Sequence, residues 1–341
     1  MIDLLVVGGG PAGLATAIHA ARAGLDVVVA EPRPGPIDKA CGEGLMPGAV
    51  KALADLGVTL AGRPIRGIRY LDDRHRAEAL FRGDPGSGVR RTELHAALAR
   101  RAAELGVPVL PLRVDAVRQD GDRVTAAGAT GGITARYLAA ADGLHSPIRR
   151  RLGLDRADLR PSRYGLRCHF AVRPWTDCVE VHWSPRAEAY VTPLGPELVG
   201  VAVLTSERGP FDVHLARFPA LAGRLPPVAV TTVRGAGPLR QRVRSRVSGR
   251  VLLVGDAAGY IDALTGEGVS LALAGAAELV RCVRTDTPDA YEPAWRRVSR
   301  RHRLLTDSLL WARARPLLAP RIVPAAARLP AAFTALVNQL A

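Results

Sequence analysis

The stretch that decides the fold is Ile2-Asp3-Leu4-Leu5-Val6-Val7-Gly8-Gly9-Gly10-Pro11-Ala12-Gly13. Its first six residues have the apolar composition of a buried strand, and the glycines end that strand. A helical pattern follows to Ala23-Gly24, and residues 26–31 (DVVVAE) form a second apolar run. Strand, glycine-rich turn, helix and strand make a βαβ unit, which predicts an α/β fold with a parallel sheet.

The glycines follow the spacing G-x-G-x-x-G, which is typical of dinucleotide-binding turns. Gly8 allows a tight turn, Gly10 lets the backbone approach a pyrophosphate at the helix N-terminus, and Gly13 lets the helix pack closely on the strand. Glu31 follows Gly10 by 21 residues and is expected to accept hydrogen bonds from a ribose. The alternative is an ordinary βαβ turn that binds no ligand. The same unit supplies three further candidate cofactor-binding residues, Pro11, Ala12 and Arg33.

Composition limits the class of protein. The 341 residues predict two domains, and 48% apolar residues suffice for a large core. Charged residues make up 23% and aromatic residues 4%, which disfavours disorder and an aromatic nucleic-acid platform. Apolar runs are too short or too charged to span a membrane, and the start lacks a secretory signal, so we expect a cytoplasmic protein.

Charge and cysteine usage narrow the partners. Residues 234–250 and 281–341 supply +13 of the net charge of +15. Attraction of phosphate-bearing cofactors explains this more simply than nucleic acid, and we expect no nucleic-acid partner. The cysteines are scattered without a C-x-x-C pair, so we expect no disulfide and no metal site. They are Cys41, Cys168, Cys178 and Cys282.

The expected domains are discontinuous in sequence. Residues 67–81 read as an inserted hairpin, short strands are expected near 108–118 and 133–140, and residues 161–235 alternate as an antiparallel sheet does. We therefore expect a nucleotide-binding domain at 1–65, 89–160 and 236–290. A β-rich substrate domain at 66–88 and 161–235 is inserted in it, and residues 291–341 form a helical C-terminal segment.

Three motifs occur in order: the glycine loop, residues 142–149 (DGLHSPIR) and residues 255–258 (GDAA). Together they resemble the FAD enzymes of the para-hydroxybenzoate hydroxylase-like group, which includes the group A flavoprotein monooxygenases and the geranylgeranyl reductases. The resemblance covers about residues 1–290. It implies a glutathione-reductase-type Rossmann FAD domain, FAD as cofactor, and NADPH or NADH as a transient reductant without a Rossmann domain of its own.

The resemblance also assigns candidate residues. Asp256, at the end of an apolar strand, is expected to bind the ribityl chain beside Gly255. A helix starting after residue 265 would stabilise negative charge on the flavin or its phosphates, with Gly266 and Gly268 against the isoalloxazine. Asp142 is expected to be either a ligand or a structural residue. The remaining cofactor-binding candidates are Lys39, Cys41, Gly42, Arg91, Val114, Gly143 and Glu267.

The leading interpretation is an NAD(P)H-using monooxygenase that hydroxylates an aromatic, phenolic and lipophilic small molecule with O2 through a flavin C4a-hydroperoxide. The alternative is a geranylgeranyl-reductase-like enzyme that saturates isoprenoid double bonds, which residues 39–44 (KACGEG) and 264–268 (LTGEG) favour. The tyrosine-tryptophan-phenylalanine-proline signature of that family is absent. The second alternative is a non-catalytic dinucleotide-binding module, which would leave Asp256 without a use.

Four residues are candidates for catalysis: Cys41, His169, His182 and Tyr190. Cys41 is a participant in hydrogen transfer in a reductase and a pocket residue in a hydroxylase. The others belong to an alternating polar set that is expected to share one sheet face, which covers either the flavin or solvent. That set is Arg167, His169, Glu180, His182, Glu188, Tyr190 and Thr192.

Two arginine-rich segments have open interpretations. Residues 240–246 (RQRVRSR) alternate, which suits either a landing site for NAD(P)H or one solvated face of a strand. Five arginines between 296 and 303 precede leucines, which suits either weak contact with a membrane surface or packing of the leucines on the flavin domain. A lipid or prenyl substrate would fit the former.

Overall fold

The expected βαβ unit opens the chain. The computed structural model describes residues 1–129, 131–158 and 160–340. Strand β1 (Ile2–Val7) leads through the glycines into α1 (Pro11–Arg22), and β2 (Val27–Ala30) returns parallel to β1 with Leu4 opposite Val27. The mixed α/β class predicted from the sequence is confirmed.

The first sheet carries the glycine loop at the carboxyl end of its central strand. Strands β11, β1, β2, β8 and β20 are parallel, so their carboxyl ends meet at one edge of the sheet. Along the sheet the order is β19 (Val247–Ser248), β20 (Val251–Leu253), β11 (Gly131–Ala140), β1, β2 and β8 (Val109–Leu110).

A small antiparallel extension departs from the sequence prediction. We expected short strands near 108–118, and Val109–Leu110 is the part of that range that joins the parallel strands. The chain then forms β9 (Ala116–Asp120) and β10 (Arg123–Gly128), which pair antiparallel with each other, and β10 also pairs antiparallel with β11. Strand β9 is polar and mostly exposed, so it has no apolar alternation by which the sequence could separate it from a loop.

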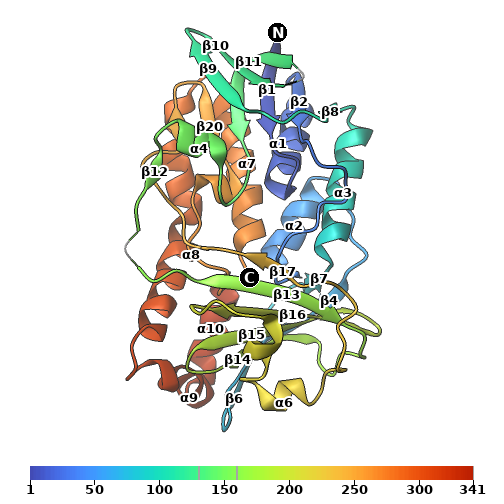
Figure 1. Cartoon of the computed structure of the whole chain (residues 1–341), viewed down its shortest axis with the longest axis vertical. Coiled ribbons are helices and arrows are strands. Elements are labelled where there is room, and N and C mark those ends of the chain that lie inside the picture. The colour runs from blue at the N-terminus through green and yellow to red at the C-terminus, as the bar shows by residue number, and fades with distance from the viewer. Residues whose placement is uncertain (130, 159, 341) are drawn as a thin grey trace.

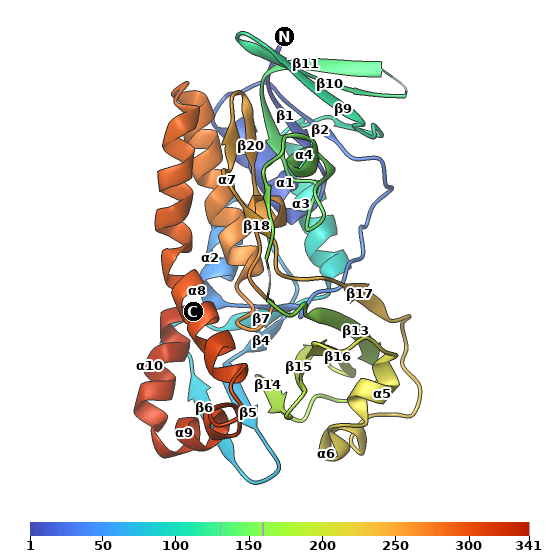
Figure 2. The same cartoon turned by 60° about the vertical axis from the view of Figure 1, so that its left-hand side comes forward.

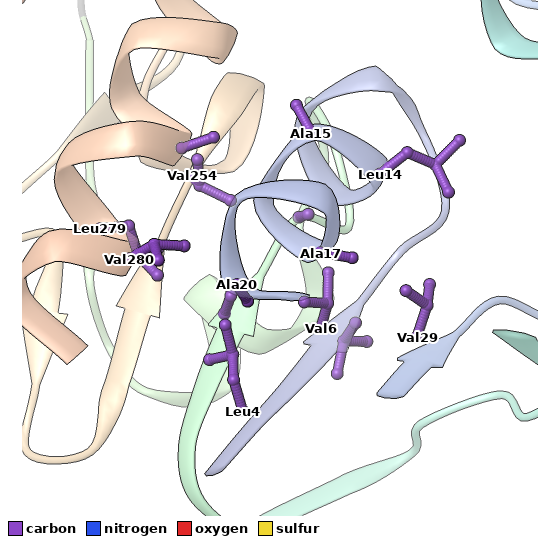
Figure 3. Packing of buried hydrophobic residues seen from close by; sticks show 14 of the residues in the cluster. Leu4, Val6, Leu14, Ala15, Ala17, Ala20, Val29, Val254, Leu279 and Val280 are labelled. Atoms are coloured by element: carbon purple, nitrogen blue, oxygen red, sulfur yellow. The ribbon is translucent and has the colours of Figure 1, made fainter. Parts of the chain in front are cut away.

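Small residues bring α1 close to the first sheet. Figure 3 shows Ala17 and Ala20 of α1 above Leu4 and Val6 of β1, with α7 (Gly268–Arg284) beside them. A Cβ added at Gly13 would lie 1.8 Å from the carbonyl oxygen of Gly8. The third glycine of the motif is therefore required by helix packing, as the sequence predicted.

The second sheet lies at the other end of the molecule (Figures 1 and 2). All of its neighbouring strands are antiparallel except β5 and β14, which are parallel. Its order is β17 (Arg234–Ala236), β13 (Tyr164–Phe170), β16 (Leu198–Thr205), β15 (Ala187–Gly195), β14 (Cys178–Trp183), β5 (Gly67–Leu71) and β6 (Arg76–Leu80). The hairpin expected at 67–81 is β5 and β6.

The expectation that seven polar residues share one face of this sheet is wrong. In the register between β14 and β15, Val181 lies opposite Tyr190 and His182 lies opposite Ala189. Glu180 and His182 therefore lie on the face opposite to that of Tyr190. Alternation within each strand fixes two faces, but which parity of one strand matches which parity of the next depends on the turn between them.

Helices cover the second sheet on both sides. Phe211 of α5 (Phe211–Leu215) and Leu221 of α6 (Pro219–Ala222) pack on one face. On the other side α9 (Ile322–Arg328) and α10 (Pro330–Leu340) pack against β6, and α8 (Tyr291–Arg313) runs along the side of the molecule from one sheet to the other (Figure 2). In the described ranges, no helix is long and apolar enough to cross a membrane. The domain boundaries stay predictions.

The remaining elements are short or connect the two sheets. A three-stranded sheet contains β3 (Gly44–Leu45), β7 (Gly86–Gly88) and β4 (Arg63–Ile65), and β12 (Asp155–Arg156) pairs with β18 (Arg242–Val243). The other helices are α2 (Pro47–Asp55), α3 (Arg91–Glu104), α4 (Pro147–Arg151) and the 3₁₀ turns Gly255–Ala258, Pro288–Ala290 and Ala319–Arg321.

Candidate active site

One cavity connects the glycine loop of the first sheet with the second sheet. At its first end the wall consists of the loop after β1, the turn after β20 and the start of α7. These three segments lie at the carboxyl edge of the parallel sheet, where open α/β sheets bind ligands. They contribute Gly10, Pro11, Ala12, Gly255, Asp256, Gly266 and Gly268.

The other end of the cavity is apolar. The second sheet supplies Tyr70, Val179, Val181, Tyr190 and Leu204. The C-terminal helices complete this wall with Leu305, Leu309, Phe333, Leu336 and Val337. Because Leu336 is exposed as well as in the wall, the apolar end reaches the surface beside α10. A long apolar ligand suits this shape.

The structure brings most of the predicted cofactor residues into this wall. Besides those already named, they are Arg33, Lys39, Cys41, Gly42, Arg91, Asp142 and Gly143. Gly8 and Gly13 act behind the wall through the turn and the helix packing. Val114 lies in the loop between β8 and β9, where it packs half-buried on the core of the first sheet rather than in the cavity.

The polar end contains buried atoms that lack a partner. Arg91 and Asp142 both line the cavity. Arg91 Nε and Asp142 Oδ1 are buried and have no hydrogen-bond partner within the described residues. Gly10 leaves its backbone open, since a Cβ there would meet only Arg91 Nη2, at 3.8 Å. Orphaned polar groups beside an open glycine loop are what a bound dinucleotide would satisfy. The residues present therefore fit FAD.

The second and third motifs are joined by a buried arginine. The Arg149 guanidinium donates to the carbonyl oxygens of Leu144 at 3.0 Å and Ala257 at 3.2 Å, and to Asp155 Oδ1 at 2.6 Å. Asp142 Oδ2 accepts from the N–H of Ile148 at 3.0 Å, and burial raises the pKa of Asp142. Arg149 thus holds the GDAA turn against the DGLHSPIR turn, and Asp142 has a structural bond as well as a free oxygen.

The Glu31 carboxylate already accepts hydrogen bonds from neighbouring residues of the protein. Its Oε2 accepts from the N–H of Gly9 at 2.8 Å, and Arg33 donates to both carboxylate oxygens. Burial alone would raise the pKa of Glu31, but the bonds from Arg33 and Gly9 outweigh burial and lower it. The carboxylate therefore holds the glycine loop in shape, and contact with a ribose stays a prediction.

We expect Glu31→Gln to weaken FAD binding by about five- to tenfold, because it replaces charged hydrogen bonds to Gly9 and Arg33 by weaker neutral ones. Fluorescence titration of the apoprotein with FAD measures this. Asp26→Asn, an exposed change at the start of the same strand region, is the matched control. An unchanged dissociation constant in Glu31→Gln would contradict the role.

Residues 41–44 form a strained segment in the cavity wall. Glu43 has φ of 60°, and its N–H donates to Cys41 Sγ at 3.4 Å. The carbonyl oxygen of Gly42 accepts from Thr192 Oγ1 of the second sheet at 2.7 Å. Burial raises the pKa of the Cys41 thiol, and Glu43 adds to this, while Arg91 opposes it. The thiol therefore stays protonated at neutral pH while lining the cavity.

Glu43 is the residue that sequence reasoning missed. Its Oε1 accepts from the N–H of Arg91 at 2.8 Å, and its Oε2 lies 2.7 Å from His169 Nε2. The only sequence signal was its place in KACGEG, because its partners lie 48 and 126 residues away. Other wall residues that the sequence did not suggest as site residues include Arg167, Tyr260 and Leu264.

The three catalytic candidates on the second sheet lie at different positions relative to the cavity. His169 lies behind the wall, between Glu43 and Thr231 Oγ1, which is 2.8 Å from its Nδ1. His182 lies on the far face, beside Glu180. Tyr190 lines the cavity, but its hydroxyl donates to the carbonyl oxygen of Leu264 at 3.0 Å, and burial raises its pKa well above 10. None of the three side chains is placed as a base in the cavity.

The side chain of Glu267 points away from the predicted cofactor site. Its Oε2 lies 2.5 Å from His302 Nδ1 of α8, while Gly266 and Gly268 on either side line the cavity. A carboxylate at the N-terminus of α7 is compatible with the helix dipole, and here it anchors α8 to that end. The expected binding contribution of Glu267 is therefore limited to its backbone.

A buried carboxyl group near the cavity makes stability depend on pH. Burial raises the pKa of Asp262 to about 6, with Glu188 adding to the shift and Arg163 opposing it. The folded state therefore keeps a proton that the unfolded state loses above its lower pKa. Stability from this group is full below about pH 4 and is lost as the pH rises to about 6.

We expect Asp262→Asn to remove roughly 3 kcal/mol of this pH dependence, since the pKa of Asp262 is raised by about two units and one unit corresponds to about 1.4 kcal/mol. Urea unfolding of the FAD-saturated protein at pH 4, 5, 6 and 7 measures it. The difference between wild type and variant isolates Asp262 from the other titrating groups. Parallel curves for the two proteins would show that Asp262 has an ordinary pKa.

Comparisons with known proteins agree with this geometry. A family model described as an FAD binding domain matches residues 1–198. The menaquinone reductase of Mycobacterium tuberculosis is 33% identical, over 80% of this chain and 74% of that protein. The chain belongs to the family with this FAD binding domain. It is an FAD-dependent oxidoreductase of the para-hydroxybenzoate hydroxylase-like and geranylgeranyl reductase-like superfamily.

Two other relatives of this FAD-dependent oxidoreductase carry different names. Digeranylgeranylglycerophospholipid reductase 2 of Methanothermobacter thermautotrophicus is 29% identical, over 86% of this chain and 83% of that protein. Protoasukamycin 4-monooxygenase of Streptomyces nodosus subsp. asukaensis is 30% identical, over 91% of this chain and 86% of that protein. The superfamily suggested by the three motifs is thus confirmed, and relatives include both reductases and a monooxygenase.

Proposed function

We propose that this protein is a reductase that uses FAD to saturate a carbon–carbon double bond in an isoprenoid chain of a lipophilic substrate. The observation that carries the proposal is the Cys41 thiol, which lines the cavity and is held protonated by burial. A reductase needs a proton donor beside the double bond. The apolar end of the cavity, which the C-terminal helices line, would hold the chain.

The chemistry divides between the cofactor and Cys41. When bound and reduced, FAD would be the source of a hydride for one alkene carbon. Cys41 Sγ–H gives its proton to the other alkene carbon, so that the double bond becomes a single bond with two new C–H bonds. The thiolate left behind is stabilised by the positive charge of Arg91 and takes its next proton from solvent.

Phenol hydroxylation is the second candidate, and the relative named protoasukamycin 4-monooxygenase favours it. Such a reaction calls for a group that promotes phenol ionisation. Within the part of the chain that is described, no histidine lines the cavity, and the Tyr190 hydroxyl resists ionisation. This makes the reductase the better match to the wall. NADPH or NADH as reductant, and weak contact of α8 with a membrane surface, remain parts of the proposal.

An anaerobic assay tests the function directly. The FAD-loaded protein, reduced with dithionite, is incubated without oxygen with a prenylated quinone and with a geranylgeranyl lipid, and products are analysed by mass spectrometry. We expect a product two hydrogens heavier than the substrate. Oxygen-dependent products that are heavier by one oxygen atom, with none of the saturated product, would replace the reductase by the monooxygenase.

A further inference from the structure

A second cavity, of about 530 Å³, lies beside the active site and is lined by arginines. Its volume is within the range of about 300 to 1,000 Å³ that small-molecule sites occupy. Among the described lining residues, Asp307 is the one carboxylate. The arginines in the wall are Arg156, Arg160, Arg240, Arg242, Arg244, Arg246, Arg296 and Arg303.

The local structure explains why these arginines converge. All four arginines of the segment 240–246 line this cavity, together with Gln241 and Val243 of the same segment. Strand β18 of that segment pairs with β12, which brings in Arg156. Helix α8 adds Arg296 and Arg303, which are seven residues apart and therefore on one helix face.

Ion pairs neutralise only part of this charge. Three carboxylates pair with wall arginines: Asp158 with Arg240, Asp307 with Arg160 and Arg240, and Glu292 with Arg246 and Arg296. Eight arginines thus face three carboxylates. In residues 1–129, 131–158 and 160–340, no ion pair is made by Arg156, Arg242, Arg244 or Arg303.

Arg246 is the most constrained member of the group. It is 6% exposed, its Nε is buried without a partner among the described residues, and its guanidinium lies 3.4 Å from the centroid of the Trp295 ring. Burial lowers its pKa to about 10, and the nearby Arg303 contributes to this, although Glu292 opposes it. A buried guanidinium with a free donor in a cavity of like charges is stabilised by an anion.

We propose that this cavity binds the pyrophosphate group of an organic ligand. Planar guanidinium groups bind phosphate oxygens in pairs, and several of them around one cavity suit a polyanion better than a single phosphate. Tyr260 lines both cavities, so a ligand anchored here lies next to the active site. Two sources share this chemistry: the nucleotide reductant and a prenyl diphosphate. The site does not depend on the reductase proposal.

The test measures binding by the FAD-loaded protein without turnover. Arg242→Gln combined with Arg303→Gln removes two exposed guanidinium groups that make no ion pair in the described structure, so folding is unaffected. Arg118→Gln combined with Arg284→Gln removes two exposed arginines outside the cavity and is the matched control. Calorimetric titration with inorganic pyrophosphate should give a dissociation constant at least tenfold higher in the cavity variant and unchanged in the control.

Organic probes then identify the source. Weakening of NADPH alone in the cavity variant assigns the site to the nucleotide. Weakening of geranylgeranyl diphosphate, with geranylgeraniol unaffected, assigns it to the substrate, and competition between the two shows that both enter. The proposal is overturned if pyrophosphate fails to bind the wild type, if the cavity and control variants lose affinity equally, or if neither organic probe is weakened.

Discussion

Replacing Cys41 by serine should lower anaerobic reductase turnover by about a thousandfold while FAD stays bound. General acid catalysis by a positioned side chain contributes about 10² to 10⁴ in rate, and a serine hydroxyl is a far weaker acid than a thiol. Serine is close to cysteine in size, so the contacts of residues 41–44 with Thr192 and Arg91 should persist. The loss then reports the proton and not the shape of the wall.

The measurement is single-turnover oxidation of the reduced protein by the prenylated substrate, followed at the flavin absorbance without oxygen. FAD content after purification shows that the variant is folded and loaded, and Cys41→Ala should be as slow as Cys41→Ser. Wild-type anaerobic rates in either variant would exclude Cys41 as the proton donor. If instead only oxygen-dependent turnover is found and Cys41→Ser retains most of it, the monooxygenase assignment is favoured.

Sequence patterns brought residues to the right place where their position depends on local backbone geometry. Gly10, Gly255 and Gly266 reached the cavity wall as expected, because a glycine turn after a buried strand has few possible conformations. The same holds for the order of the three motifs, whose turns lie at one edge of a parallel sheet. Spacing along the chain was sufficient to predict where these residues lie, and their contacts with FAD stay predictions.

Contacts between distant segments were beyond the reach of spacing. The face assigned to His182 was wrong because β14 and β15 are joined by a turn that sets their relative parity. Glu43 was not predicted as a site residue, because its side chain contacts His169 of the second sheet, which is far away in the sequence. The sequence predicted that the C-terminal helices pack on the protein, but not that they form a cavity wall. The apolar pattern around Leu305 and Phe333 does not show which residues these side chains contact.

Removing the carboxylate of Asp256 should weaken FAD binding by about a hundredfold. The residue follows β20 and lines the cavity, and within the described residues no side-chain hydrogen bond or ion pair occupies its carboxylate. At Gly255 the φ is +63°, and a Cβ would meet Ala12 Cβ at 2.6 Å, so the turn brings the backbone close to the glycine loop. A carboxylate there is free to accept hydrogen bonds from the ribityl hydroxyls.

Hydrogen bonds to charged groups contribute about 1.5 to 3 kcal/mol, and the upper part of that range corresponds to the hundredfold loss in Asp256→Ala. Asp256→Asn keeps an acceptor without the charge and should lose about tenfold. FAD content on purification and titration of the apoprotein measure both, and Asp289→Ala, which removes an exposed carboxylate in the 3₁₀ turn after α7, is the control. If Asp256→Ala purifies with a full complement of FAD, the ribityl assignment is wrong, and the orphaned atoms of Arg91 and Asp142 become the principal contacts to test.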